Sequence, residues 1–172
     1  MNTNSVDFFN LNKVLPIKQN QKIIIAVWGI GNPGNMGQII RLGHNLGAQQ
    51  VIFVNDEIKF RESKIKKTAG FSYEQMEWQF ISIPNFLDLL NSDYKLVVLE
   101  TCEKAINIFH TSLPDKIILL AGSESHGLPS NIISKSNLSV YIPMPGACKS
   151  MNVSHAISVA AFEWYRQKSG KF

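Results

Sequence analysis

The chain has little of what marks several large protein classes. Its two cysteines, Cys102 and Cys148, form no CxxC pair, and its four histidines show no HxxxH spacing, so no disulfide scaffold and no metal site are predicted. No apolar run approaches the roughly 18 residues of a membrane helix. The polar N-terminus has no basic cluster before an apolar stretch, so no signal peptide is expected. These absences predict a cytoplasmic protein without metal or membrane span.

Several nucleotide-binding and hydrolytic motifs are also missing. No GK[ST] follows the first glycine-rich segment, which argues against a P-loop, and no GxSxG elbow indicates a hydrolase triad. Gly29, Gly31 and Gly34 fit the string GxGxxG, but Pro33 and Gly37 spoil the usual strand–turn–helix spacing. A Rossmann-type oxidoreductase is therefore a competing interpretation with weak support.

The composition is that of one globular domain with a local basic excess. Of 172 residues, 45% are apolar and 17% charged, and the net charge is +4. The segment 59–67 holds five basic residues against Glu62, a net +4 that equals the excess of the whole chain. Such a patch suits a polyanion such as RNA, although a solvated helix face is the alternative. The candidate RNA-binding residues here are Arg61, Lys64, Lys66 and Lys67.

Hydrophobic periodicity predicts strands alternating with helices. Short apolar runs predict six strands, over 22–28, 51–54, 80–83, 95–99, 116–121 and 139–142. Helical patterns cover 36–46, 61–70, 84–90, 103–109, 129–133 and 152–167, with Asn35 as the expected N-cap of the first and Gly47 at its end. The alternation predicts an α/β fold whose mainly parallel six-stranded sheet is flanked by helices. Residues 1–21 are expected to form an N-terminal arm, and residues 22–172 the domain.

Three segments rich in glycine and asparagine follow apolar runs, at 32–37, 121–129 and 142–152. Strand ends that feed loops are where an open α/β sheet holds its ligand, so these segments predict one composite site and favour an enzyme. Arg41, one turn into the first helix, suits a phosphate, with a surface salt bridge as the alternative. Glu124 is placed to hold a donor such as Arg41.

The remaining polar side chains of these segments are open to two interpretations each. His126 is a candidate general base, but a loop histidine is more often a solvated residue. Ser150 or Asn152 can cap the long helix that follows, and a cap needs only one of them. Cys148 has no base nearby in sequence and is expected to be inert.

Read together, the three segments resemble the motifs of the SPOUT superfamily, in its SpoU (TrmH-type) branch of RNA ribose 2′-O-methyltransferases. The resemblance covers about residues 23–167, and the motifs occur in order. They read NPGNMGQIIR with Asn35, Gly37 and Arg41; LLAGSESHGLP with Gly122, Glu124 and Gly127; and YIPMPGACKSMNVSHAISV with Pro143, Met144, Gly146, Ser150 and Asn152. Met151 stands where many members carry leucine, a nearly isosteric exchange.

This resemblance implies a C-terminal trefoil knot, an exception to the rule that chains are unknotted. It also implies a homodimer, with Phe162 and Trp164 of the last helix as candidates for the interface and with the partner's Arg41 near the bound cofactor. The implied cofactor is S-adenosylmethionine. Its expected contacts are Leu99, Glu100, Thr101, Ala121, Gly122, Gly127, Ile142, Met144, Ser150 and Met151.

The resemblance places Arg41 at the ribose hydroxyl as its activator and as an RNA contact. A guanidinium is a poor base at neutral pH, so it acts either by stabilising the developing oxyanion or as a base altered by its setting. Asn35, Glu124, Ser150 and Asn152 are expected to orient Arg41, the ribose and the cofactor.

The resemblance leaves the RNA open. The stretch from Ser150 resembles the end of short enzymes that act on the tRNA wobble position, whereas the first motif is closer to general tRNA and rRNA members. The chain lacks room for the extra RNA-binding domain of many rRNA enzymes, which favours tRNA. The alternative is an RNA-binding or assembly factor that has lost catalysis, and four intact residues argue against it: Arg41, Glu124, Ser150 and Asn152.

Overall fold

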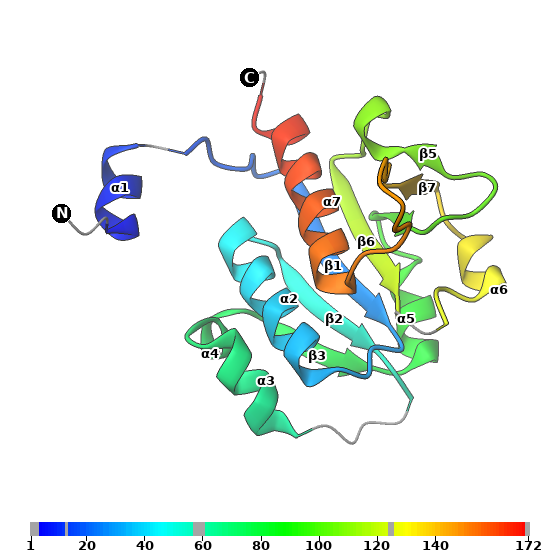
Figure 1. Ribbon diagram of the computed structural model, residues 1–172, viewed down its shortest axis with the longest axis horizontal. Coiled ribbons are helices and arrows are strands. Elements are labelled where there is room, and N and C mark those ends of the chain that lie inside the picture. The colour runs from blue at the N-terminus through cyan, green and yellow to red at the C-terminus, as the bar shows by residue number, and fades with distance from the viewer. Residues whose placement is uncertain (1–3, 13, 57–60, 124–125, 171–172) are drawn as a thin grey trace.

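The computed structural model describes residues 4–12, 14–56, 61–123 and 126–170. Figure 1 shows a central sheet with helices on both sides. Seven strands form the sheet in the order β3-β2-β1-β6-β4-β7-β5, and all neighbours pair in parallel. The strands are β1 (Lys22–Trp28), β2 (Gln50–Val54), β3 (Trp78–Ile81), β4 (Lys95–Leu99), β5 (Ile106–Asn107), β6 (Lys116–Gly122) and β7 (Leu138–Tyr141). The α/β class and the parallel sheet are confirmed, but the expected six strands are wrong by one.

Alternate residues of the strands feed two separate cores, because successive side chains of a strand point to opposite faces. On one face, Ile23 and Val27 of β1 pack with α2 and α7; on the other, Ile24 packs with Phe86 of α5. Burial on both faces explains why β1 is a continuous apolar run. The helices are α1 (Ser5–Leu11), α2 (Pro33–Leu46), α3 (Glu62–Ala69), α4 (Ser72–Gln75), α5 (Ile83–Leu89), α6 (Ser130–Ile133) and α7 (Val153–Lys168), with a 3-10 turn η1 (Ile108–His110).

Helix α2 begins three residues earlier than predicted, so Asn35 is not its N-cap. Asn32 takes this role, and its side chain accepts hydrogen bonds from the amides of Gly34 (2.8 Å) and Asn35 (3.4 Å). Pro33 then occupies the first turn, where its missing N–H costs nothing. The predicted end is right, because Gly47 caps the helix in the left-handed conformation with φ +71°.

The helix predicted over 103–109 is wrong. The short strand β5 pairs there with the edge strand β7, through Ile106 and Asn107. The Asn107 side chain then accepts from the amide of Phe109 (3.0 Å) and starts η1, which buries Ile108 completely. Pairing with an exposed strand edge satisfies backbone groups that a helix would satisfy internally, and this tertiary alternative is invisible to local periodicity.

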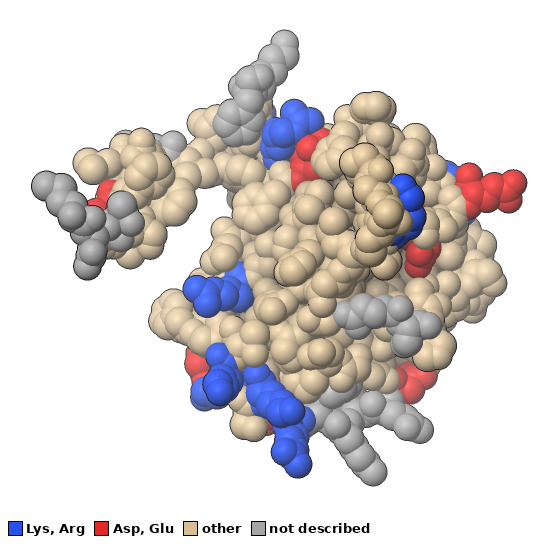
Figure 2. Space-filling model, in the orientation of Figure 1, with Lys and Arg blue, Asp and Glu red and all other residues tan. Residues whose placement is uncertain are grey.

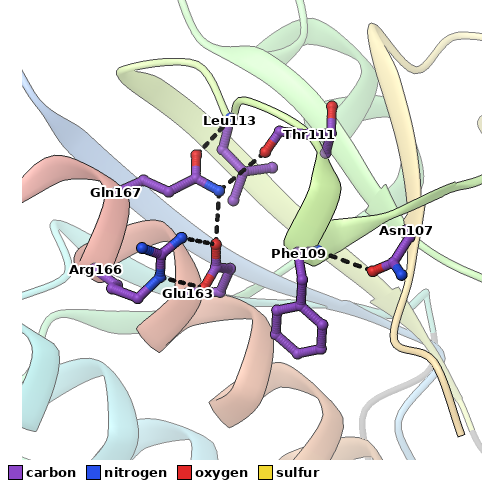
Figure 3. Close-up of polar contacts among 7 residues, drawn as sticks. All are labelled: Asn107, Phe109, Thr111, Leu113, Glu163, Arg166 and Gln167. Carbon is purple, nitrogen blue, oxygen red and sulfur yellow. Dashed lines mark hydrogen bonds and ion pairs between the residues drawn. The ribbon is translucent and has the colours of Figure 1, made fainter. Parts of the chain in front are cut away.

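The C-terminal half of α7 is anchored to the rest of the chain by a polar network (Figure 3). Glu163, only 7% exposed, accepts two hydrogen bonds from Arg166 and one from Gln167, all at 2.8 Å. Gln167 in turn bonds the backbone of Thr111 (3.0 Å) and Leu113 (2.8 Å). This network holds α7 against the segment between η1 and β6.

The position of Trp164 on α7 contradicts part of the expected dimer interface. Trp164 is fully buried in its own chain, and its Nε1 donates to the carbonyl of Pro114 at 2.9 Å. It therefore offers no surface to a second copy of the chain. Phe162 is 47% exposed and stays a candidate for the interface.

The first described residues form α1, which lies apart from the body of the molecule in Figure 1. Its apolar side chains, including Phe8 and Phe9, are more than half exposed. The following segment reaches α7, where the Tyr165 hydroxyl donates to the carbonyl of Leu15 (2.9 Å), and Ile17 packs against the core. The division at residue 21 into arm and domain stays a prediction.

Candidate active site

One cavity of about 290 Å³ lies where β4, β6 and β7 end, closed on one side by the start of α7. The carboxyl ends of adjacent parallel strands are the usual ligand site of an open α/β sheet. All ten residues predicted to contact a cofactor line it: Leu99, Glu100, Thr101, Ala121, Gly122, Gly127, Ile142, Met144, Ser150 and Met151. The fold thus brings the second and third segments together around one space, while the role of these residues toward a cofactor stays a prediction.

Five further residues line the cavity that the sequence did not single out: Ser123, Tyr141, Lys149, Val153 and Ala156. The first three are sequence neighbours of predicted cavity residues, and this adjacency could have identified them. Val153 and Ala156 are three positions apart at the start of α7 and so lie on one face of it. Lys149 also donates to the carbonyl of Met144 (2.9 Å), which links two parts of the third segment.

Two glycines make the floor of the cavity possible. A Cβ placed on Gly122 would lie 2.2 Å from the carbonyl carbon of Gly127, so no side chain fits there. Gly127 itself has φ +61°, a conformation that residues with a Cβ rarely adopt. The amide of Gly127 donates to the carbonyl of Ser123 (3.0 Å), which holds these two residues together.

Glu100 braces this loop from the end of β4. One carboxylate oxygen accepts from the amide of Leu128 (3.1 Å) and the other from the amide of Thr101 (3.0 Å). A Cβ on Gly127 would approach the same carboxylate to 2.9 Å. The charge of Glu100 is therefore used to position the second segment, in addition to its place at the cavity wall.

The first and third segments meet at a polar junction between α2 and α7. The side-chain nitrogen Nδ2 of Asn152 donates to Oδ1 of Asn35 (3.1 Å). Asn35 lies within α2 and is only 6% exposed. Asn152 also caps α7 by accepting from the amide of Ser154 (2.9 Å). The Ser154 hydroxyl lies 2.6 Å from Oδ1 of Asn152 and 2.5 Å from Oε1 of Gln38. Asn152 is thus both the cap and the link to α2, and Gln38 and Ser154 are partners that the sequence reasoning missed.

Arg41 is not brought to this cavity within one chain. It is exposed on α2 and is absent from the cavity lining, and no ion pair of Arg41 occurs within the described ranges. Asn35, six positions earlier, is buried toward α7, so the two side chains leave the helix on different sides. Glu124, predicted to hold Arg41, lies outside the described residues.

The other polar candidates of the loops are solvent-facing. His126 is exposed and does not line the cavity. Ser150 lines it and does not cap α7, since Asn152 does so.

Basic side chains gather over α2 and α3 (Figure 2). We call Arg41, Arg61, Lys64, Lys66 and Lys67, all exposed, the basic surface. Within it, Lys66 forms an ion pair with Glu74 (2.6 Å) and lies 5.4 Å from the centre of the Tyr73 ring. The hydrogen bond and charge of Glu74 raise the pKa of Lys66, so its charge persists but is locally balanced.

Among the helices in the described ranges, none has the length and apolar character that a bilayer span requires. In the same part of the chain, no three His, Cys, Asp or Glu side chains are grouped so that they could hold a metal ion.

Comparison with known proteins gives a consistent answer. The model of the SpoU rRNA Methylase family matches residues 22–162. A 23S rRNA (guanosine-2′-O-)-methyltransferase, RlmB of Acinetobacter baylyi, is 28% identical over 154 residues, covering 88% of this chain and 62% of that protein. The tRNA (guanosine(18)-2′-O)-methyltransferase of Aquifex aeolicus is 25% identical over 166 residues, covering 94% and 76%. Across three curated relatives, the chain spans 43% to 76% of their length.

Solved structures share the fold. One, from work on the 2-OH methylation of C/U34 on tRNA, superposes with a TM-score of 0.79 at 25% identity, covering 88% of this chain and 99% of that one. The SpoU methyltransferase AviRb of Streptomyces viridochromogenes, solved in complex with the cofactor AdoMet, gives 0.78 at 22% identity, covering 89% and 60%.

Proposed function

Because the chain belongs to the SpoU rRNA methylase family, we propose that it methylates a ribose 2′-hydroxyl in tRNA or rRNA, with S-adenosylmethionine as donor. The observation that carries the proposal is the cavity at the ends of β4, β6 and β7, which gathers all ten expected cofactor contacts. Relatives named for rRNA and for tRNA methylation support the reaction class. The structural neighbour from work on the 2-OH methylation of C/U34 on tRNA favours tRNA.

The cavity residues fit the donor. Leu99, Ile142, Met144 and Met151 offer apolar surface to a planar base and a thioether-like stem. Gly122 has no Cβ, which lets the backbone of Gly127 pack directly against it at the cavity wall. When bound, S-adenosylmethionine supplies the methyl group from its sulfonium.

Arg41 is proposed to act on the ribose. A guanidinium stays protonated at neutral pH, so it stabilises the alkoxide-like oxygen that develops on the attacking hydroxyl. Asn152 and the buried Asn35 fix α2 against the third segment and thereby position that helix. Ser150, on the cavity wall, and Glu124, outside the described residues, complete the proposed set.

The position of Arg41 supports a homodimer, which we also propose. Arg41 does not line the cavity of its own chain, so in the proposed dimer the partner's Arg41 lies beside this chain's cavity. Mixed dimers of Arg41→Ala and Gly122→Ala test this arrangement. If the site is shared, each mixed dimer retains one site with intact cavity and intact arginine, and part of the activity returns. If each site is built from one chain, activity at low donor concentration stays at or below that of Gly122→Ala alone.

We also propose that the C-terminal segment is threaded as a trefoil knot and that the protein works in the cytoplasm, where tRNA and rRNA are found. Support for the knot comes from chain order. β7 lies beyond β4, yet α7 returns to pack on α2 and β6 on the other side of β4.

The experiment that tests the function is methyl transfer from labelled S-adenosylmethionine. Total tRNA and, separately, rRNA from a strain lacking the gene serve as acceptors, followed by nucleoside mass spectrometry. A 2′-O-methylnucleoside on either RNA is expected and names the substrate. RNA binding and donor binding without transfer to either pool would instead indicate an assembly factor.

A further inference from the structure

Phe71 is the most exposed aromatic side chain in the described ranges, with 76% of its surface open. It follows Gly70, which ends α3 with φ +59° and turns the chain into α4. Burying a phenylalanine is normally favourable, so an exposed ring indicates a binding site only when the residues around it suggest a ligand. The residues around Phe71 lie on α2 and α3.

A neighbouring ring and a buried hydrogen bond support Phe71 from one side. The His44 ring lies 5.9 Å from the Phe71 ring, centre to centre, with 39° between their planes. Nδ1 of His44 is 3.0 Å from the hydroxyl of Ser72, a side chain only 5% exposed. His44 is therefore held in place, and it backs a ring that remains open to solvent.

This pair borders the basic surface, because His44 lies on α2 with Arg41 and Phe71 follows α3. α2 and α3 meet at Gly37, where a Cβ would come within 2.6 Å of the carbonyl oxygen of Ile65. Arg41 and His44 follow Gly37 by four and seven positions, so all three share one face of α2. The rise from Arg41 to His44 is about 4.5 Å along the axis. The exposed Lys64 and Lys67 precede Phe71 on α3.

We propose that Phe71, backed by His44, is a stacking platform for an unpaired base of the RNA substrate, close to the ribose that Arg41 addresses. This inference rests on the proposed function and adds how the RNA is held. An aromatic face within a cationic track is the usual design for single-stranded RNA, because every base offers a π-face. A protein partner fits less well, since lysine is depleted in the cores of protein interfaces.

The test is RNA binding by Phe71→Ala, measured without S-adenosylmethionine over a series of salt concentrations. The probes are a single-stranded oligoadenylate and a blunt RNA duplex. For the single strand, we expect about tenfold weaker binding with an unchanged salt slope, because the ring carries no charge. The duplex, whose bases are already stacked, should lose much less. Phe71→Tyr should bind like the unaltered protein. The matched control is Phe109→Ala, a 45% exposed ring on η1, with no change expected.

Three outcomes would overturn the platform: unchanged single-strand affinity in Phe71→Ala, equal losses for single strand and duplex, or a Phe71→Tyr variant as weak as Phe71→Ala. A change in mass by light scattering with RNA affinity intact would also overturn it and assign Phe71 to a protein contact. Thermal unfolding of each variant verifies that the fold is kept. Failure of the proposed function is separate, since it appears as absent methyl transfer by the unaltered protein.

Discussion

The cavity and the basic surface are built by opposite means. The cavity is made of strand ends, glycines and apolar side chains, and its polar groups, such as Glu100, are occupied by the protein's own backbone. The basic surface consists of exposed charged side chains on α2 and α3, of which only Lys66 has a described ion-pair partner. A preformed concave site suits a small ligand, whereas unpaired surface cations suit a large polyanion. The proposed reaction needs both, and they lie apart within one chain.

The sharpest way to separate the two regions is Arg41→Ala. Removing the group that stabilises a developing oxyanion should lower the rate of methyl transfer by about 100- to 1,000-fold. Donor binding, measured by calorimetry, should be unchanged because Arg41 is proposed to contact the ribose and is none of the ten expected donor contacts. Arg41→Lys is the matched variant: it keeps the charge but loses the guanidinium fork, so an intermediate rate is expected. Equal losses of donor binding and turnover would contradict this division of roles.

The reverse experiment is Gly122→Ala. Its Cβ would meet the carbonyl carbon of Gly127 at 2.2 Å, so the loop must shift. Overpacking of this kind costs about 1–3 kcal/mol, which would appear as about 5- to 150-fold weaker donor binding while RNA binding is kept. Gly146→Ala is the control in the third segment, because nothing lies within 4 Å of its added Cβ. Donor binding that survives Gly122→Ala but not Gly146→Ala would move the site away from the β6 end.

The sequence predicted the cavity better than it predicted the relation of the cavity to Arg41. Strand ends such as Leu99 and Ala121 follow from continuous apolar runs, and parallel pairing then brings them to one edge of the sheet. The direction of a helical side chain depends on which face of α2 is buried, which tertiary packing against α3 and α7 decides. The same reason explains why Trp164 was wrongly assigned to the interface: its partner, the carbonyl of Pro114, is 50 residues away in the chain.

A substitution at Glu163 tests whether the polar network that anchors α7 affects stability alone. Helix α7 contributes to the cavity wall, but Glu163 lies in neither the cavity lining nor the basic surface. Glu163→Gln should lower the free energy of unfolding at pH 7 by about 2 kcal/mol, because hydrogen bonds to a charged, largely buried group are weakened. RNA affinity should be unchanged. Urea unfolding measures the loss, and the exposed Glu103→Gln is the control, expected within about 0.5 kcal/mol.

The pH dependence of this loss has a fixed sign. Hydrogen bonds from Arg166, and then from Gln167, lower the pKa of Glu163 below its ordinary value despite burial. A lowered pKa in the folded state stabilises the protein fully above the unfolded value of about 4.3, and this contribution is lost as pH falls through the folded value. The difference between Glu163→Gln and the unaltered protein should therefore shrink below about pH 4. A difference that grows on acidification would mean that Glu163 does not act as a paired carboxylate.

The smallest effects belong to the lysines of the basic surface. Each phosphate contact that is lost should flatten the slope of log affinity against log salt by about 0.7 for single-stranded RNA. Neutralising Lys64 and Lys67 together should therefore lower the slope by roughly 1.4 if both contact phosphates. Adding Lys66→Ala should change it less, since Glu74 already balances that charge. Lys135→Ala, exposed just after α6 on the opposite face of the sheet, is the control and should leave the slope unchanged. If Lys135→Ala flattens the salt slope as much as the loss of Lys64 and Lys67, the RNA does not follow α3. The basic surface would then not be the RNA-binding region.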